Sequence, residues 1–207
     1  ARKGLELAED QPLPLTLDPK IDGVAASLRY EDGRLVLAAT RGDGRTGDDI
    51  TAQVRVMRSV ALHLDASRAP VPPVLEIRGE IYMPNAEFER INRDREQRGE
   101  PLLANARNAA AGTLKSLDPS LTAERGLCFV AHGRGETRGL DDVDGYAAFL
   151  DRVRELGLPV TDATRAEDID AAVARIEAFR DRRGSLPYGV DGMVVRVDEF
   201  ARQRVLG

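Results

Sequence analysis

The sequence has few cysteines, which could form disulfides, and few aromatic residues. It contains no tryptophan, a single cysteine and only 4% aromatic residues among 207 positions. One cysteine cannot form a disulfide within the chain, which favours a reducing, cytoplasmic setting, and Cys128 in its apolar run is expected to be a small buried hydrophobe. No stretch resembles a signal peptide and no apolar run approaches the ~18 residues of a membrane span, so we expect a soluble protein without membrane contact.

Several motifs of common enzyme classes are also missing. The P-loop pattern GxxxxGK[ST] does not occur, and no serine lies in a nucleophile-elbow sequence. Only two histidines are present, His63 and His132, which are too few for a His-rich metal site. These absences argue against P-loop nucleotide hydrolysis, serine hydrolase chemistry and zinc chemistry.

The charge balance offers no general attraction for nucleic acid. Acidic residues outnumber basic ones by 35 to 30, which gives a net charge of -5. Any contact with DNA must therefore use local basic patches. The length is that of one large domain or two small ones and is sufficient for a buried core.

The order of apolar patterns and turn signals predicts an α+β fold with mainly antiparallel sheets flanked by helices, since strict βαβ alternation is absent. Strands are expected at residues 15–17, 24–30, 34–41, 74–82, 127–132 and 192–197, the last of them buried because it is apolar almost throughout. Helices are expected at residues 46–58, 84–98, 145–156, 167–182 and 199–206, with a short one inside 105–119. The first helix is expected to open on a capping box at residues 46–49.

Lys20 stands out because it lies where a strand ends and a hairpin begins. A lysine is a nucleophile only as the free amine, and a reference pKa near 10.4 leaves roughly one molecule in a few thousand in that form at neutral pH. Burial or nearby cations would lower the pKa, and such an amine can attack a carbonyl carbon or a phosphorus. Taken alone, Lys20 is better explained as an ordinary solvated lysine at a strand end, and only its neighbours favour a functional role.

The neighbouring residues carry a resemblance that covers nearly the whole chain. Lys20-Ile21-Asp22-Gly23 resembles the KxDG motif of covalent nucleotidyltransferases, which include DNA ligases, RNA ligases and mRNA capping enzymes. More specific are ATRGDGRTGDDIT (39–51), LEIRGEIYMP (75–84), ANARNAAAGTLKSLDP (104–119) and LPYGVDGMVVRVD (186–198), in that order. Together they resemble the adenylation domain of NAD-dependent, bacterial-type DNA ligases.

The resemblance implies a fold and a domain organisation. Residues 1–207 would form a single adenylation domain with the covalent nucleotidyltransferase fold. It would be a fragment of a larger ligase, lacking the N-terminal domain that binds nicotinamide mononucleotide (NMN) and the C-terminal OB-fold, zinc-finger, helix-hairpin-helix and BRCT domains.

The resemblance also implies a reaction. Lys20 would attack the α-phosphorus of NAD, expel NMN and become a lysyl-adenylate. The AMP would pass to the 5′-phosphate of a nick in double-stranded DNA, and the 3′-hydroxyl would then seal the strand, in replication or repair. The expected cofactors are NAD as AMP donor and magnesium.

The resemblance gives residues of this chain their expected roles. Lys20 and Asp22 are the expected catalytic pair, and the expected nucleotide-binding residues are Asp18, Ile21, Arg41, Glu80, His132, Asp191, Val194 and Arg196. Expected contacts to DNA phosphate come from Arg107, Lys115 and Arg183, and magnesium is expected near Asp22 and Asp191.

Simple chemistry agrees with several of these roles. An arginine fork such as that of Arg41 suits phosphate, Glu80 can accept hydrogen bonds from ribose hydroxyls, and the flat ring of His132 can stack on a base. On an ideal helix Arg107 and Lys115 would lie within about 80° and ~12 Å of each other, so both could follow one phosphate backbone. The basic run at residues 90–98 is different, because interleaved glutamates predict a salt-bridged, solvated helix face.

Three positions depart from the family pattern. Asp18 replaces a glutamate, Lys115 replaces an arginine, and Arg196 replaces a lysine that contacts the α-phosphate in the family. These departures leave a second interpretation open, an adenine-nucleotide-binding module that no longer catalyses. A third, an ATP- or GTP-dependent RNA ligase or capping enzyme, shares KxDG but is not expected to carry the longer motifs. Covalent charging of Lys20 separates the first two.

Overall fold

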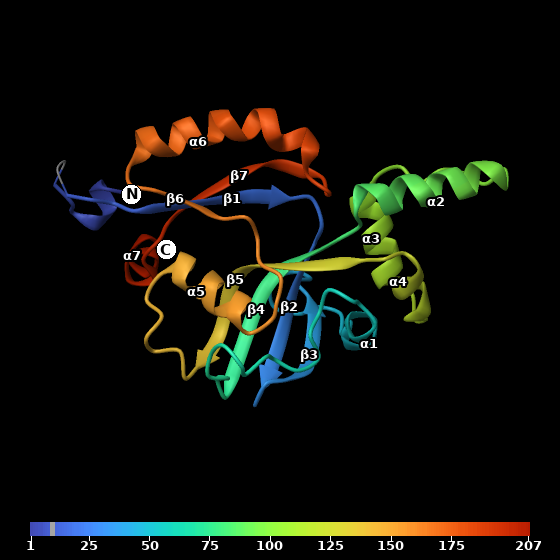
Figure 1. The fold of residues 1–207 in the computed structure, drawn as a ribbon, viewed down its shortest axis with the longest axis horizontal. Coiled ribbons are helices and arrows are strands. Elements are labelled where there is room, and N and C mark those ends of the chain that lie inside the picture. Colours follow the sequence, from blue (N-terminus) through green and yellow to red (C-terminus); the bar gives the residue numbers. More distant parts are fainter. Residues whose placement is uncertain (9–10) are drawn as a thin grey trace.

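The computed structural model describes residues 1–8 and 11–207, and it consists of two β-sheets with helices around them (Figure 1). The strands are β1 (Leu15–Ile21), β2 (Val24–Glu31), β3 (Arg34–Thr40), β4 (Val74–Tyr82), β5 (Cys128–Arg138), β6 (Thr164–Ala166) and β7 (Val190–Val197). The α-helices are α1 (Thr51–Arg55), α2 (Asn85–Gln97), α3 (Ala106–Leu114), α4 (Ser120–Glu124), α5 (Tyr146–Glu155), α6 (Ile169–Arg182) and α7 (Phe200–Leu206). Two short 3-10 helices are η1 (Lys3–Leu5) and η2 (Arg183–Ser185).

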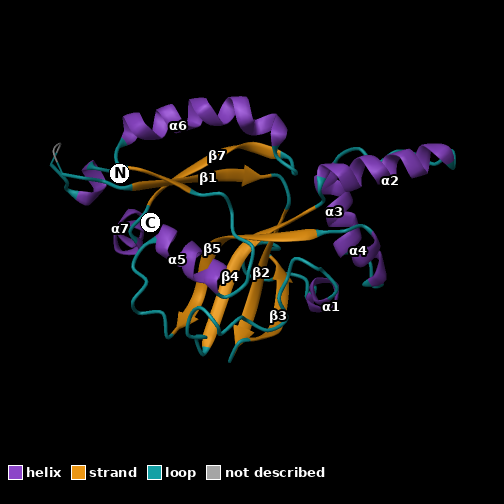
Figure 2. Cartoon of the chain, in the orientation of Figure 1, coloured by secondary structure: helices purple, strands orange, loops and turns teal. Residues whose placement is uncertain are grey.

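Every pairing between these strands is antiparallel. The small sheet has the order β6-β1-β7 and the large sheet the order β3-β2-β4-β5. Figure 2 shows the two sheets as separate layers, with α6 along the outer side of the small sheet. The predicted α+β class with antiparallel sheets is therefore confirmed. No helix in the described part of the chain is long and apolar enough to cross a membrane.

The large sheet has one apolar and one polar face because its strands alternate. On β4, Leu75, Ile77 and Ile81 are fully buried in the main core, whereas the intervening Glu76, Arg78 and Glu80 are on the opposite face. The small sheet packs its own apolar residues, including Leu15 and Leu17, against α6. The polar face of the large sheet is thus available to line a site.

The chain passes from the small sheet to the large one at the end of β1. Asp22 and Gly23 form this passage, and the backbone N–H of Asp22 donates to the carbonyl oxygen of Gly189 at 2.8 Å. A Cβ at Gly23 would lie 2.6 Å from the carbonyl oxygen of Ile81, so only glycine lets β2 approach β4 this closely. Lys20 is consequently fixed at the junction of the two sheets.

The helix predicted at residues 46–58 is wrong in its start and its length, because only Thr51–Arg55 is helical. The preceding residues form a tight loop that returns to β3, where Thr40 N–H donates to the carbonyl oxygen of Asp48 at 3.0 Å. Asp43 accepts hydrogen bonds from the backbone of Arg45 and Thr46, which competes with helix formation. Glycines 42, 44 and 47 also have the GxGxxG spacing, but the flanking strands are antiparallel and α1 has only five residues, so no dinucleotide-binding βαβ unit is present.

Three smaller expectations also differ. Val195 is 40% exposed, so β7 is not buried throughout, because it is an edge strand of the small sheet. Cys128 is only partly buried, at the start of β5. The helix α4 and the strand β6 have no counterpart in the sequence prediction, since each is too short to show a periodicity.

Two glycine substitutions test this packing with opposite signs. A Cβ at Gly79 would overlap the carbonyl oxygen of Val130 and the ring of Phe129, so Gly79→Ala should lower the free energy of unfolding by about 3 kcal/mol. Gly112 lies in α3 with open space around it, so Gly112→Ala should raise that free energy by roughly 0.5–1 kcal/mol. Denaturant titration measures both free energies of unfolding, and equal effects of the two substitutions would contradict the close packing of Gly79 against Val130 and Phe129.

Candidate functional site

Lys20 is held at the junction of the sheets by an ion pair. Its Nζ donates to Oδ2 of Asp191 at 2.5 Å, across the β1–β7 pair in which Lys20 is opposite Gly192. This hydrogen bond holds the pKa of the Asp191 carboxyl below its usual value. The Lys20 side chain is 55% exposed and lines a cavity of about 980 Å³, so it is open to a ligand.

Asp22 is oriented toward a different cation. Its Oδ1 lies 3.3 Å from Nη1 of Arg107 on α3. Asp22 and Asp191 are therefore both paired with basic side chains, and the described residues contain no group of three or more His, Cys, Asp or Glu side chains suited to a metal ion. Protein side chains alone do not form a magnesium site here, and a bound Mg²⁺ would take most of its ligands from phosphate oxygens and water.

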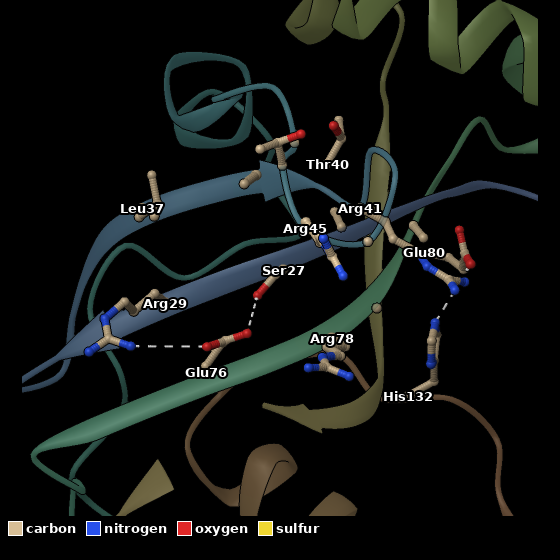
Figure 3. Close-up of a pocket in the computed structure, with 17 residues that line it drawn as sticks. Ser27, Arg29, Leu37, Thr40, Arg41, Arg45, Glu76, Arg78, Glu80 and His132 are labelled. Carbon is tan, nitrogen blue, oxygen red and sulfur yellow. Dashed lines mark hydrogen bonds and ion pairs between the residues drawn. The ribbon is translucent and has the colours of Figure 1, made fainter. Parts of the chain in front are cut away.

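Glu80 and His132 project from neighbouring strands into a second cavity of about 710 Å³ (Figure 3). His132 Nε2 lies 3.7 Å from Glu80 Oε1. The other carboxylate oxygen, Oε2, is buried and has no hydrogen-bond partner among the described residues. A buried acceptor without a donor is costly, so this oxygen is suited to a hydroxyl group of a ligand.

Arg41 and Glu80 connect the two cavities. Both line the cavity of Lys20 and the cavity of His132. Arg41 follows β3. Its backbone N–H donates to the carbonyl oxygen of Ala25 at 2.9 Å, which fixes the backbone position from which its side chain extends. Figure 3 shows Arg41 beside Glu80 at the end of the sheet where His132 lies. One elongated ligand could thus contact His132, Glu80, Arg41 and Lys20 in turn.

Arg196 is anchored away from Lys20. Its Nη2 is 3.0 Å from Oδ1 of Asp18, its Nη1 donates to the carbonyl oxygen of His132 at 3.0 Å, and its guanidinium lies 4.0 Å over the ring of Tyr146. In the strand register Arg196 is opposite Thr16, four residues or about 13 Å from the level of Lys20. In the protein without ligand, Arg196 therefore belongs to the His132 end of the site.

Tyr146 is the site residue that the sequence analysis missed. It begins α5, is almost fully buried, and its hydroxyl donates to the carbonyl oxygen of His132 at 2.9 Å. A tyrosine on the apolar side of an amphipathic helix is typical of ordinary core. Its contact with Arg196 joins segments 50 residues apart, and no local pattern could have indicated it.

The remaining predicted residues lie at different depths. Ile21 lines the Lys20 cavity but is mostly buried in a small apolar cluster with Val130 and Val190. Val194 is half-buried on β7 opposite Asp18. Neither Asp18, Val194 nor Arg196 is among the described residues that line the two cavities.

Two of the three predicted DNA contacts meet at the Lys20 cavity. Arg107 lies in the first turn of α3 and Lys115 is the C-cap residue of that helix, and both line that cavity. Arg183 differs, because its Nη2 donates to the carbonyl oxygen of Val190 at 2.6 Å and holds the start of β7. The predicted salt-bridged face of α2 is confirmed by the pairs Arg90–Glu87, Arg90–Asp94, Arg93–Glu89, Arg95–Glu100 and Arg98–Glu100.

Asp18 allows a test by pH. It is 1% exposed, and burial raises its pKa to about 6 despite the nearby Arg196. Because the folded state holds this proton more tightly than the unfolded state, the contribution to stability is present at pH 4 and is lost as the pH rises through 6. The free energy of unfolding of the wild type minus that of Asp18→Asn should fall by up to about 3 kcal/mol between pH 4 and 7. A difference that is constant over this range in urea titrations would contradict the assignment.

Comparison with known proteins identifies the family of the chain. The family model described as "NAD-dependent DNA ligase adenylation domain" matches residues 2–207. A "DNA ligase" of Methylobacterium nodulans is 45% identical over 207 residues, which cover 100% of this chain and 25% of that relative. A "DNA ligase" of Thermomicrobium roseum is 43% identical over 209 residues, covering 100% of this chain and 30% of that relative.

A solved structure named "Pmar-Lig_Pre." has a TM-score of 0.50 and 11% identity, and the match covers 94% of this chain and 40% of that chain. At this identity the likeness concerns the fold alone. The chain spans only about 25–30% of the length of these curated relatives. The match over nearly every residue nevertheless shows that the chain belongs to the family of NAD-dependent DNA ligase adenylation domains.

Proposed function

We propose that this chain carries out the nucleotidyl-transfer chemistry of an NAD-dependent DNA ligase, with Lys20 as the nucleophile. The observation that carries the proposal is that an accessible lysine, Lys20, lines the same cavity as Glu80, which has a buried carboxylate oxygen without a hydrogen-bond partner among the described residues. Glu80 also lines the cavity of His132. An adenylate has the matching groups, a ribose hydroxyl for Glu80 and an electrophilic phosphorus for Lys20.

In the proposed complex the adenine ring stacks on His132 and a ribose hydroxyl donates to Glu80 Oε2. The α-phosphate then lies near Arg41, which lines both cavities, with Arg107 and Lys115 adding positive charge on the Lys20 side. These cations offset the charge that develops on the phosphate oxygens during transfer. A Mg²⁺ ion bound mainly to the phosphates would add to the same effect.

Lys20 Nζ forms a bond to the α-phosphorus of NAD while the bond from that phosphorus to the bridging oxygen breaks, and NMN leaves with that oxygen. The ammonium group of Lys20 must lose one proton before it attacks and a second, which passes to solvent, once the bond to phosphorus has formed, so that an uncharged N–H remains in a phosphoramidate whose phosphate oxygen keeps its negative charge. Asp191 is the proposed acceptor of the first proton, since its oxygen is in hydrogen-bond contact with Nζ and its lowered pKa keeps it ionised at neutral pH.

In the second step an oxygen of the 5′-phosphate at a DNA nick attacks the adenylate phosphorus and Lys20 leaves. In the third step the 3′-hydroxyl oxygen attacks the 5′-phosphate phosphorus and AMP leaves. We propose that further domains of a longer polypeptide take part in both, in line with the greater length of the relatives. They would include an OB-fold, a zinc finger, helix-hairpin-helix motifs and a BRCT domain, whereas an NMN-binding domain would act in the first step, where it would hold the NMN half of NAD.

The first test is the intact mass of the protein expressed from its complete gene, after incubation with magnesium and either NAD or ATP. We expect one added adenylate with NAD only, and none in a Lys20→Ala variant. No gain with either nucleotide would favour the alternative of a binding module without catalysis. A gain with ATP alone would assign the chain to another branch of the superfamily.

A second test addresses the proton acceptor. Asp191→Asn keeps the shape of the side chain but removes its charge, so the rate of lysyl-adenylate formation should fall about 100-fold. Asp191→Glu should recover part of the rate. Asp162→Asn is the matched control, because Asp162 is likewise exposed and paired with a basic residue, Arg182, at 3.4 Å. An Asp191→Asn variant as fast as this control would remove Asp191 from the mechanism.

A further inference from the structure

The side chain of Leu117 is 97% exposed beside the proposed catalytic cavity. It belongs to the turn between α3 and α4 and lines the same cavity of about 980 Å³ as Lys20, Arg107 and Lys115. Other large apolar side chains at the surface, such as Leu102 at 56% and Ile169 at 63%, keep more of their area covered. Single exposed leucines are common in proteins, so the surroundings of Leu117 must decide what it does.

The turn that carries Leu117 is held on both sides by hydrogen bonds. The mostly buried Gln53 donates its Nε2 hydrogen to the carbonyl oxygen of Ser116 at 2.8 Å. On the other side, Asp118 Oδ1 accepts from the backbone N–H of Ser120 at 2.9 Å, where α4 begins. The leucine is therefore presented on a fixed backbone, and the entropy cost of ordering it for a partner is small.

The neighbouring charges indicate the chemistry of that partner. Lys115 and Arg107 line the same cavity, and Lys115 has no ion pair with an acidic side chain among residues 1–8 and 11–207. A partner that meets both the cations and the leucine must carry anionic groups beside an apolar surface. A DNA strand has this arrangement, because each pair of phosphates is separated by a deoxyribose with an exposed C–H face.

We propose that Leu117 packs against a deoxyribose and base edge of a DNA strand end at the nick, while Lys115 and Arg107 contact the adjoining phosphates. This contact positions the nick over Lys20 for the two steps that involve DNA and takes no part in the reaction with NAD. The inference rests on the proposed ligase function, which it deepens by naming a positioning residue for the DNA substrate.

The test uses the protein expressed from its complete gene with a Leu117→Ser substitution. Affinity is measured for a labelled nicked duplex, and single-turnover sealing is measured on a nick that already carries a 5′-adenylate. We expect both to fall about tenfold, because an apolar contact is lost. The rate of lysyl-adenylate formation from NAD should stay within about twofold of the wild type, since this step involves no DNA.

Two variants make the result specific. Leu117→Met, which keeps an apolar side chain of similar volume, should bind and seal like the wild type. Leu102→Ser makes the same chemical change at an exposed leucine that is not among the described residues lining either cavity, and it should have no effect.

Several outcomes would overturn the inference. Leu117→Ser could bind and seal nicked duplex as well as Leu102→Ser does. It could also lower the Tm of the DNA-free protein, which would mean that Leu117 packs against another part of the polypeptide. If the wild type forms lysyl-adenylate and the Leu117→Ser variant binds nicked and intact duplex as well as the wild type does, this inference alone is overturned. A wild type that neither forms the adenylate nor binds nicked DNA would overturn the proposed function with it.

Discussion

The passage of the chain from the small sheet to the large sheet at Asp22–Gly23 is the constraint on which the site depends. The close approach of β2 and β4 at Gly23 and the hydrogen bond of Asp22 N–H fix the end of β1 in three dimensions. Lys20 precedes this passage, so its position relative to Glu80 and Arg41 on the large sheet is set by backbone packing. A side chain placed in this way needs no flexible loop to bring it to a ligand in the cavity.

A second set of hydrogen bonds fixes the opposite end of the β1–β7 pair. Asp198, which follows β7, is mostly buried and accepts hydrogen bonds from the hydroxyl of Thr16 and from the backbone N–H of Ala147. It thereby joins β1, β7 and the start of α5, and α5 carries Tyr146. The small sheet is thus fixed to the rest of the protein at both ends of β1, which explains how a three-stranded sheet can form a wall of the site.

Much of the fold, and several residues that line the candidate site, could be predicted from the sequence for identifiable reasons. Strands such as β4 and helices such as α5 show strong periodicity in their apolar residues. Lys20 and Glu80 lie in short sequence motifs that can be recognised without knowing which residues are in contact. The failures have a physical cause in common. The length of α1 is decided by side-chain hydrogen bonds of Asp43 in the loop before it, and the roles of Tyr146 and Gln53 arise from contacts with segments distant in sequence.

Two of the departures from the family pattern meet in a single ion pair. Asp18 is one methylene shorter than glutamate, and Arg196 has a longer side chain than the lysine it replaces, so the pair can span the same two strands with a 3.0 Å contact. The planar guanidinium of Arg196 at the same time donates to the carbonyl oxygen of His132 and lies over the ring of Tyr146. The two substitutions are therefore best understood as one change, which replaces a flexible amine with a planar cation that is fixed against the backbone of His132. At the Lys20 end of the site the ion pairs are Lys20–Asp191 and Arg107–Asp22, and an anionic ligand that entered this cavity would compete with both carboxylates for their cations.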